Sequence, residues 1–277
     1  MTTPTSTVTF PKIYSVMSPK GGVGKSTSLS ALALYISEVR NQKVLLLDLD
    51  NIATLTNNFQ GDKVRHPELS NVTDLYVDPD GKDMLKVSVV RPNIHLIQGD
   101  SKIHEINSKN SIELISLLED NLHQRIPDIS TYDYILIDTP AGVGNSVLSA
   151  LICSDYIYSP IDLDTNSISA IDELTRVLKP IKRRMNPKLA WKGLLINRVA
   201  KLVPVLGARL PEALNHRKIY TDITSKYTDV VLGVICNRNA IQRAVTSGQW
   251  IAGRDQSSLD AIREVSTFCE NLLETKA

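Results

Sequence analysis

The run of residues 20–27, KGGVGKST, combines the residue types that bind a phosphate group. Glycines without a Cβ let the main chain approach phosphate oxygens and donate its N–H groups to them. Lys25 can place its ammonium beside the outer phosphates of a nucleotide, and Ser26 can offer its hydroxyl to Mg²⁺. The predicted nucleotide-binding residues of this run are Gly21, Gly22, Val23, Gly24, Lys25, Ser26 and Thr27.

The residues on either side of this run supply the elements that a phosphate-binding loop needs. An apolar stretch over Ile13–Met17 predicts a strand, and the apolar spacing after Ser26 predicts a helix. A helix that begins directly after the glycines points its free N–H groups toward an anion. A glycine-rich turn that only caps this helix is the alternative, but it would not need a lysine and a hydroxyl in this order.

Two further apolar stretches end in aspartate. Val44–Asp48 is followed by Leu49 and Asp50, so the carboxylates of Asp48 and Asp50 can point the same way from the end of a strand. Tyr134–Asp138 ends likewise, and its carboxylate could hold Mg²⁺, often through water. Ligands of open α/β sheets bind at the carboxyl ends of the strands, so we expect these aspartates beside the phosphates. Capping of the next helix by Asp48 and Asp50 is an alternative that stays open.

Strand-like and helix-like patterns alternate along the chain, which predicts a doubly wound α/β fold with a mostly parallel sheet. The expected strands are Ile13–Met17, Val44–Asp48, Ile94–Ile97, Tyr134–Asp138, Tyr156–Ile161, Gly193–Asn197 and Val230–Ile235. The expected helices are Ser26–Arg40, Ser111–Leu122, Ser167–Arg184, Ala240–Gly248 and Ser258–Leu273. We expect one domain over residues 12–277 after a flexible tail over residues 1–11, with a polar, loop-like insertion over Gly61–Pro92.

The overall composition is ordinary for a globular protein and excludes several classes. A net charge of +1 argues against a globally basic nucleic-acid binder, so any DNA contact needs a local basic patch. No apolar run approaches the ~20 residues that span a bilayer. The three cysteines lie far apart and the five histidines lack ligand spacing, which disfavours disulfides and zinc and favours a reducing cytoplasm.

The run contains a second lysine, Lys20, in addition to Lys25, and this lysine indicates a particular family. KGGVGKST resembles the deviant Walker A box of the ParA/MinD group of ATPases, and the resemblance extends from about Ile13 to Leu273. It implies ATP and Mg²⁺ as cofactors. It also implies an ATP-dependent homodimer in which Lys20 reaches the phosphates bound by the other subunit, while Lys25 corresponds to the ordinary Walker lysine.

The resemblance also gives roles to the aspartates. Asp50 would orient the attacking water, and Asp48 would lie near the metal. The sequence Asp-Thr-Pro-Ala-Gly that starts at Asp138 resembles the segment called switch II. Asn51 and Ile52 replace the usual Pro-Gln of the segment called switch I, which bears on its geometry and on the rate of hydrolysis. The implied catalytic residues are Lys20, Lys25 and Asp50, and the implied metal-site residues are Ser26, Asp48 and Asp138.

Two later segments resemble the parts of the group that contact the nucleotide base. The implied residues are Asn197, Arg198, Cys236 and Asn237. An asparagine amide offers a purine edge both a donor and an acceptor, but Asn197 could equally be a turn residue after a strand. Cys236 stands where the group usually has a proline.

Three branches of the group can be told apart by features of the sequence. The iron–sulfur branch needs two cysteines between subunits, and the chain has no cysteine before Cys153 to accompany it. MinD-type proteins end in a basic amphipathic helix, which residues 268–277 do not resemble. Long ParA proteins carry a helix-turn-helix domain before the phosphate-binding loop, and the short stretch before residue 20 does not accommodate one.

We therefore expect the short ParA type, a cytoplasmic, nucleoid-associated ATPase without membrane contact. Hydrolysis would be slow and stimulated by DNA and by a ParB-like or other cargo adaptor, and the cargo would be a plasmid, a chromosome or a protein organelle. A MinD-like positioning ATPase and a dethiobiotin-synthetase-like enzyme that uses ATP on a small substrate are the alternatives.

Such an ATPase would bind DNA without sequence preference through clustered basic side chains. We expect these in the C-terminal region, where the group has its DNA contacts. The expected residues are Arg217, Lys218, Arg238 and Arg243, and the alternative cluster is Lys179, Lys182, Arg183 and Arg184.

Overall fold

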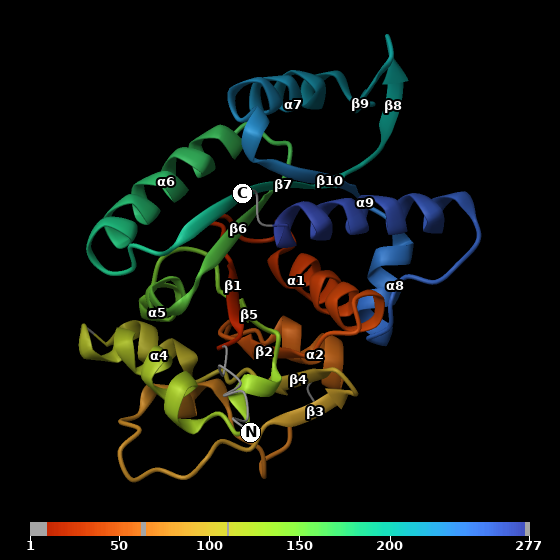
Figure 1. Ribbon diagram of the computed structural model, residues 1–277. Coiled ribbons are helices and arrows are strands. Elements are labelled where there is room, and N and C mark those ends of the chain that lie inside the picture. The colour runs from red at the N-terminus through yellow and green to blue at the C-terminus, as the bar shows by residue number, and fades with distance from the viewer. Residues whose placement is uncertain (1–9, 62–64, 110, 275–277) are drawn as a thin grey trace, which may run out of the picture.

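An eight-stranded sheet forms the centre of the computed structural model, which describes residues 10–61, 65–109 and 111–274 (Figure 1). The strand order is β10-β7-β6-β1-β5-β2-β4-β3, and all neighbours pair in parallel except the edge strand β3, which runs antiparallel to β4. This arrangement confirms the predicted doubly wound sheet. The strands are β1 (Lys12–Val16), β2 (Val44–Asp48), β3 (Ser88–Arg91), β4 (Ile94–Ile97), β5 (Tyr134–Asp138), β6 (Tyr156–Ile161), β7 (Ala190–Val199) and β10 (Val231–Cys236).

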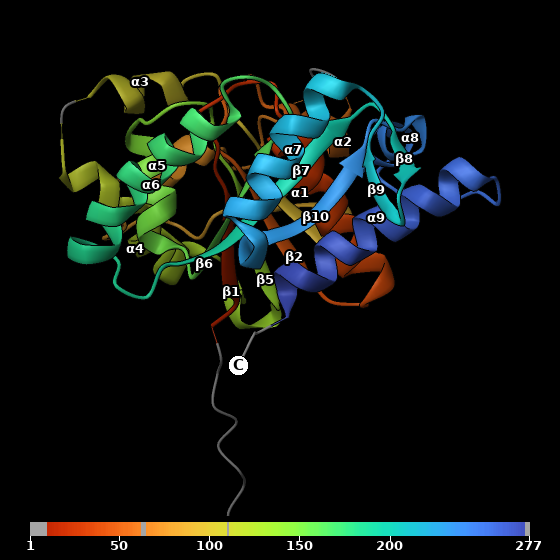
Figure 2. The ribbon, with the colours of Figure 1, turned by 90° about the horizontal axis from the view of Figure 1, so that it is seen from above.

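Helices cover both faces of this sheet, as Figures 1 and 2 show from two directions. One face packs against α1 (Lys25–Leu34), α2 (Thr54–Gln60), α8 (Asn239–Ser247) and α9 (Gln256–Leu273). The other face packs against α3 (Ile103–Ser108), α4 (Glu113–Arg125), α5 (Asn145–Cys153), α6 (Ser167–Arg184) and α7 (Leu214–Lys226). The central strands are covered on both sides, and their continuous apolar sequences reflect this burial.

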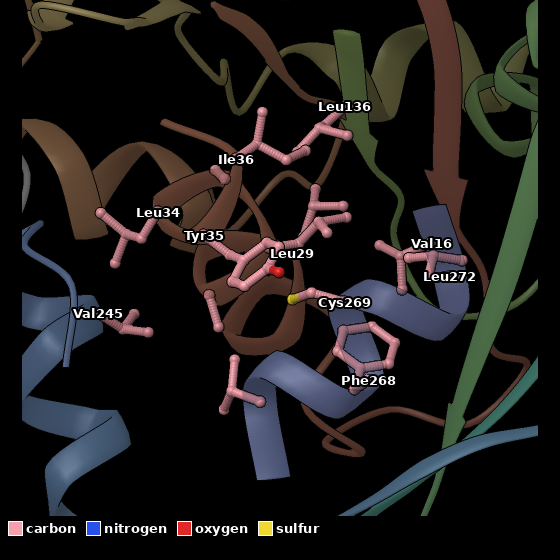
Figure 3. Close-up of a cluster of buried hydrophobic side chains, with 14 of the residues drawn as sticks. Val16, Leu29, Leu34, Tyr35, Ile36, Leu136, Val245, Phe268, Cys269 and Leu272 are labelled. Carbon is pink, nitrogen blue, oxygen red and sulfur yellow. The ribbon is translucent and has the colours of Figure 1, made fainter. Parts of the chain in front are cut away.

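Helix α1, which follows the glycine-rich run, is enclosed between the sheet and α9. Leu29 and Leu34 are fully buried, and Figure 3 places them with Phe268 and Leu272 of α9 in one apolar cluster. The helix continues as a π-helical turn, η1 (Tyr35–Val39), whose first residue donates its hydroxyl to Glu270 at 3.1 Å. These contacts pack α1 and the turn that follows it against α9, and the glycine-rich run enters the opposite end of the same helix.

The structure adds several elements to those expected from the sequence. Beyond the expected strands it contains β3 and a separate two-stranded hairpin of β8 (Leu202–Val205) and β9 (Ala208–Pro211). The hairpin is short and two of its four described pairs include a proline, so strand periodicity is weak there. The additional helices are α2, α3, α5 and α7, together with the 3₁₀ turns η2 (Val72–Tyr76), η3 (Ile129–Thr131) and η4 (Thr228–Val230).

The stretch expected to be a loop-like insertion consists largely of loops and turns over its described length, and it is packed against the core. Val72, Leu75 and Leu85 are buried in the core beneath α4. Asn121 of α4 donates its amide to the carbonyl oxygens of Leu75 and Val77, at 3.1 and 2.8 Å. Polar side chains thus bind backbone groups that lack strand or helix partners, which is why the polar sequence did not reveal the packing. Of the expected N-terminal tail, residues 1–9 lie outside the described residues.

A close backbone approach in β7 generates a test of the fold. Gly193 has φ +140°, and a Cβ added there would lie 2.0 Å from the carbonyl oxygen of Val230. Gly193→Ala should therefore lower the free energy of unfolding by roughly 2–4 kcal/mol, because the neighbouring backbone must move. Urea unfolding followed by circular dichroism measures this effect. Gly81→Ala is the control, since Gly81 also has positive φ but its Cβ would meet no atom within 4 Å; an equal loss in both variants would contradict the argument.

Candidate nucleotide-binding site

The glycine-rich run leaves the carboxyl end of β1 and enters the N-terminus of α1. Gly22 and Gly24 have φ of +75° and +88°, in the left-handed region that glycine adopts without strain. Gly24 caps α1, and a Cβ at this position would lie 2.3 Å from the amide nitrogen of Asn197. The loop is therefore compact, and the free N–H groups of the first turn of α1 are available to an anion.

Two side chains from the end of β7 hold this loop. Asn197 is buried and donates its side-chain amide to the carbonyl oxygen of Val23 at 2.9 Å. Arg198, in the left-handed region with φ +58°, donates to the carbonyl oxygen of Gly22. The amide N–H₂ group of Asn197 thus contacts the loop, whereas the predicted role at this position was to read the base.

A cavity of about 160 Å³ opens beside the loop, between β7, β10 and α8. It brings together most of the residues that the sequence predicted around the nucleotide, although they are separated by more than 200 positions in the chain. The lining residues are Gly22, Gly24, Thr27, Asn197, Arg198, Ile235, Cys236, Asn237, Arg238, Ile241 and Gln242. Its walls combine apolar side chains with amides, which suits a flat heterocycle with polar edges.

Asp138, at the end of β5, is fully buried with both carboxylate oxygens lacking a hydrogen-bond partner among the described residues. Burial raises its pKa well above the ordinary value, the nearby Asp48 carboxylate raises it further, and Ser26 and Lys25 act in the opposite direction. Lys25 is itself buried, which lowers its pKa, and Asp138 and Asp50 are the charges that favour its protonated form. An unpartnered buried carboxylate is costly unless a cation completes the site.

Mg²⁺ fits this arrangement. The described residues contain no group of three or more His, Cys, Asp or Glu side chains that could hold a metal ion by themselves. Mg²⁺ in nucleotide sites commonly takes one or two protein oxygens and fills its other positions with water and phosphate oxygens. Asp138 and the Ser26 hydroxyl would supply the protein's share and would place the ion beside the phosphates held by Lys25.

Asp48 has a different role from the one predicted. Its Oδ2 accepts hydrogen bonds from the backbone N–H and the hydroxyl of Thr56, at 2.7 and 2.8 Å, and its Oδ1 accepts from the N–H of Asp50 at 3.3 Å. Oδ2 thus anchors α2, while Oδ1 bonds to the turn before it. Both oxygens already accept hydrogen bonds, so Asp138, whose oxygens have none among the described residues, is the better candidate for a metal ligand. Burial raises the pKa of Asp48 to about 6, and the hydrogen bonds from Thr56 limit the rise.

Asp50 lies in the turn between Asp48 and α2. Its Oδ1 accepts the N–H of Ile52 at 3.0 Å, and its backbone carbonyl accepts the N–H of Ala53 at 2.9 Å. Asn51 and Ile52, which replace the usual Pro-Gln, are exposed at the surface of this turn. The structure thus brings Asp50 close enough to act electrostatically on Lys25 and Asp138.

Lys20 contacts two carboxylates that were not predicted from the sequence. Its Nζ lies 2.8 Å from each oxygen of Asp162 and also contacts Asp164, both in the loop after β6. The only sequence signal was acidic residues directly after an expected strand, at the edge of the sheet where ligands bind.

The basic residues predicted to contact DNA separate into two kinds. Arg238 donates to Glu264 at 2.7 and 3.1 Å and lies 3.4 Å from Asp260, with its side chain only 15% exposed. It binds α9 and is not available to DNA, so we remove it from the predicted set. Arg217 is partly buried and donates its Nε to the carbonyl oxygen of Pro211 at 2.7 Å, whereas Lys218 and Arg243 are exposed. The alternative cluster at the end of α6, Lys179, Lys182, Arg183 and Arg184, is exposed as well.

A parallel sheet with a glycine-rich loop entering α1, a buried lysine and a carboxylate at the end of a neighbouring strand defines a P-loop nucleotide-binding protein. Comparison with known proteins refines this class. A family model described as AAA domain matches residues 11–191, well over half of the chain. The chain belongs to this family and is a ParA/MinD-like P-loop ATPase.

Individual relatives agree with this assignment. The sporulation initiation inhibitor protein Soj of Bacillus subtilis is 26% identical, over 92% of this chain and 98% of its own length. A plasmid partition protein of Borrelia burgdorferi, solved with AMPPNP, is 27% identical with a TM-score of 0.72, covering 95% of this chain and 98% of its own. Cobyrinic acid a,c-diamide synthase of Mycobacterium smegmatis, solved with an ATP analogue and magnesium, has a TM-score of 0.70, with 95% and 96% of the chains covered. It is 19% identical, so it shares the fold alone.

The contrast between Asp48 and Asp138 generates a prediction about stability. Asp138→Ala removes a buried carboxylate without a hydrogen-bond partner among the described residues, but it also takes from the buried Lys25 one of its two neighbouring negative charges. Because the two effects oppose each other, the free energy of unfolding of the nucleotide-free variant at pH 8 should change little from the wild type. Asp48→Ala leaves the N–H of Thr56 without its acceptor and should cost roughly 2–4 kcal/mol. Stabilisation of the folded protein by ATP with Mg²⁺, measured as a shift of the melting temperature, should be lost only in Asp138→Ala.

The change of stability with pH provides a second test, because its sign follows from the shifted pKa values of the two aspartates. Both carboxyl groups have raised pKa values, so the folded state binds more protons than the unfolded state. Stability of the nucleotide-free wild type should therefore fall as pH rises from about 4 through about 6, with a smaller slope in Asp138→Ala. A stability that rises over this range, or a marked destabilisation by Asp138→Ala at pH 8, would contradict the assignment.

Proposed function

We propose that this protein is an ATP- and Mg²⁺-dependent homodimer that binds DNA without sequence preference and segregates or positions a cargo in the cytoplasm. The observation that carries the proposal is a phosphate-binding loop with two lysines, Lys20 and Lys25, that point in different directions. Lys25 is buried beside Asp138 and Asp50, whereas Lys20 is partly exposed and lies outside this group. Only Lys20 is therefore placed to leave its own subunit.

The chemistry of hydrolysis follows from the residues around the loop. The N–H groups of the glycine-rich run and the ammonium of Lys25 bind and orient the phosphates, and Asp138 with Ser26 holds Mg²⁺. Asp50 orients the attacking water toward the terminal phosphate, and its turn beside α2 can respond to the loss of that phosphate. Lys20 of the second subunit neutralises phosphate charge that would otherwise repel across the dimer interface.

The relatives support the choice of a partition or positioning role. Soj of Bacillus subtilis, a chromosome partitioning protein ParA of Myxococcus xanthus and the plasmid partition protein of Borrelia burgdorferi are all similar to this chain at 25–27% identity. We infer a ParB-like or other adaptor as the partner that stimulates hydrolysis, nucleoid DNA as the surface that is bound, and a plasmid, a chromosome or a protein organelle as the cargo. No helix among the described residues is long and apolar enough to cross a bilayer.

A metabolic ligase is the second candidate, because a cobyrinic acid a,c-diamide synthase shares the fold. Such an enzyme would use ATP on a small substrate and would have no need for a second lysine that leaves its own site. ATPase activity that rises with nonspecific DNA supports the partition role, whereas activity that depends on a small carboxylic substrate supports the ligase.

Substitution of Asp50 tests the catalytic part of the proposal. Asp50→Ala should bind ATP with an affinity close to that of the wild type, because Lys25 and Asp138 are unchanged. Hydrolysis should fall by about 10²-fold or more, since a positioned general base or water-orienting group contributes roughly this factor. Isothermal titration and phosphate release measure the two effects, with Asp100→Ala as a control carboxylate beyond β4. Wild-type turnover in Asp50→Ala would assign the attacking water to another group.

Charge reversal tests the DNA surface. The triple variant Arg217→Glu, Lys218→Glu and Arg243→Glu should lose most ATP-dependent DNA affinity and retain basal ATPase activity. Each phosphate contact that is lost should also reduce the slope of log affinity against log salt by about 1. Fluorescence anisotropy with two unrelated duplexes measures both quantities. Loss of binding in Arg183→Glu with Arg184→Glu, and not in the triple variant, would place the surface on α6.

A further inference from the structure

Lys20 makes a three-point contact with the loop that follows β6. Its Nζ lies 2.8 Å from Oδ1 and 2.8 Å from Oδ2 of Asp162, and it also donates to Oδ2 of Asp164. Burial alone would lower the pKa of Lys20, but the hydrogen bonds with the two carboxylates outweigh this and raise it. The pKa of Asp164 is lowered in turn, chiefly by its hydrogen bond with Lys20. Lys20 thus meets two negative charges on its own subunit.

The loop that presents these carboxylates is ordered by its own hydrogen bonds. Oδ1 of Asp164 accepts from the N–H of Asn166 at 2.9 Å, and the N–H of Asp164 donates to the hydroxyl of Ser167 at 3.1 Å. The Ser167 hydroxyl also donates to the carbonyl oxygen of Asp162, and Ser167 itself is buried at the start of α6. The loop therefore has hydrogen bonds that do not involve Lys20. These bonds can hold the two carboxylates in place when the lysine leaves.

We propose that Asp162 and Asp164 are positioning residues that hold Lys20 on its own subunit until phosphates bound by a second subunit compete for it. This inference rests on the proposed role of Lys20 in the dimer. The side chains of Lys20, Asp162 and Asp164 are 32%, 27% and 37% exposed, so water screens the contact. Because the contact is screened and weak, Lys20 can exchange it for the phosphates of a nucleoside triphosphate, which offer more negative charge and several oxygens.

The contact makes dimerisation depend on more than nucleotide binding. Each subunit must break its own contact between Lys20 and the two carboxylates before the lysine can reach the other subunit. The free energy needed to break this contact is therefore required twice in a symmetric dimer. Removing the two carboxylates should therefore favour the ATP dimer without changing the affinity of the monomer for ATP. A role in folding alone would change stability and would leave the dimer equilibrium unaffected.

Lysine labelling tests whether the contact holds Lys20 in solution, with no assumption about the dimer. Nucleotide-free wild type and Asp162→Asn with Asp164→Asn are exposed to a mild acetylating reagent, and the rate at each lysine is read by mass spectrometry. Lys218, an exposed lysine of α7, is the internal reference. Lys20 should react several-fold faster in the variant, because loss of the carboxylates lowers its pKa and frees the amine. An unchanged relative rate would overturn the proposal.

Sedimentation at increasing protein concentration, with ATP and Mg²⁺, tests the consequence for the dimer. The double Asn variant should reach half dimerisation at a concentration about fivefold to twentyfold lower than the wild type, as expected for a partly exposed ion pair broken on each subunit. Asp172→Asn with Glu173→Gln removes two exposed carboxylates of α6 and is the charge-matched control. A double Asn variant that dimerises less readily than the wild type, or equally, would overturn the proposal.

Lys20→Gln separates this inference from the function on which it rests. If Lys20→Gln alone still forms the ATP dimer at wild-type concentrations, the lysine has no role across the interface and the proposed function fails at that point. If Lys20→Gln prevents the dimer and the double Asn variant leaves it unchanged, only the positioning role fails. Adding Asp162→Asn and Asp164→Asn to Lys20→Gln should leave dimerisation as it is in Lys20→Gln alone, because the carboxylates act through the lysine.

Discussion

The carboxylate of Asp138, buried at the end of β5 without a hydrogen-bond partner among the described residues, is the constraint around which the site is organised. β5 lies between β1 and β2 in the sheet, so the glycine-rich loop leaves one neighbour and the turn with Asp50 leaves the other. Asp48 and Asp138 are direct partners in the register of β2 and β5. The parallel order of these three strands therefore brings the glycine-rich loop, Asp138 and the turn that carries Asp50 to one edge of the sheet.

The two sides of this site differ in how firmly they are held. On one side, α1 is packed against α9, and Asn197 and Arg198 bond the loop to β7. On the other side, Asp50 lies in an exposed turn whose ends are held by the bonds between Asp48 and Thr56. The glycine-rich loop is therefore held by more contacts than the turn, which is anchored at a single buried carboxylate. In the proposed function, this difference would let the turn change conformation on loss of the terminal phosphate while the loop keeps the nucleotide in place.

Residues that are close in the sequence were predicted with more success than residues that meet only in the fold. The phosphate-binding loop depends on the backbone conformation of a few consecutive glycines and on the helix that follows, so the motif indicates the structure by itself. The central strands and their mostly parallel pairing followed from apolar sequences that alternate with helical patterns, whereas the order of the strands was not predicted. The polar stretch between α2 and β4 is loop-like as expected, but its packing was not predicted, because its backbone groups are bonded to a side chain of α4, which lies far along the chain.

The role of each charged residue depended on its neighbours in three dimensions. Asp48 and Asp138 end similar apolar strands, yet one is bonded to Thr56 and the other has no such partner. Arg238 was indistinguishable from Arg243 in the sequence until the structure placed Glu264 beside it. The side-chain hydrogen bonds in these two examples join residues 8 and 26 positions apart, and such pairs leave no periodic signal that a single sequence could reveal.

The same reasoning explains how a chain of nearly neutral net charge could present a basic surface. Acidic side chains of the same chain form ion pairs with some cations, as Glu264 does with Arg238 and Asp162 with Lys20. Exposed cations of α6, α7 and α8 are among those that contribute to the local surface potential. Binding to DNA depends on the number of phosphates neutralised together, so the proposed dimer would double that number without any change in net charge per chain. The proposed nucleotide-dependent dimerisation would therefore be a sufficient physical means of controlling DNA affinity.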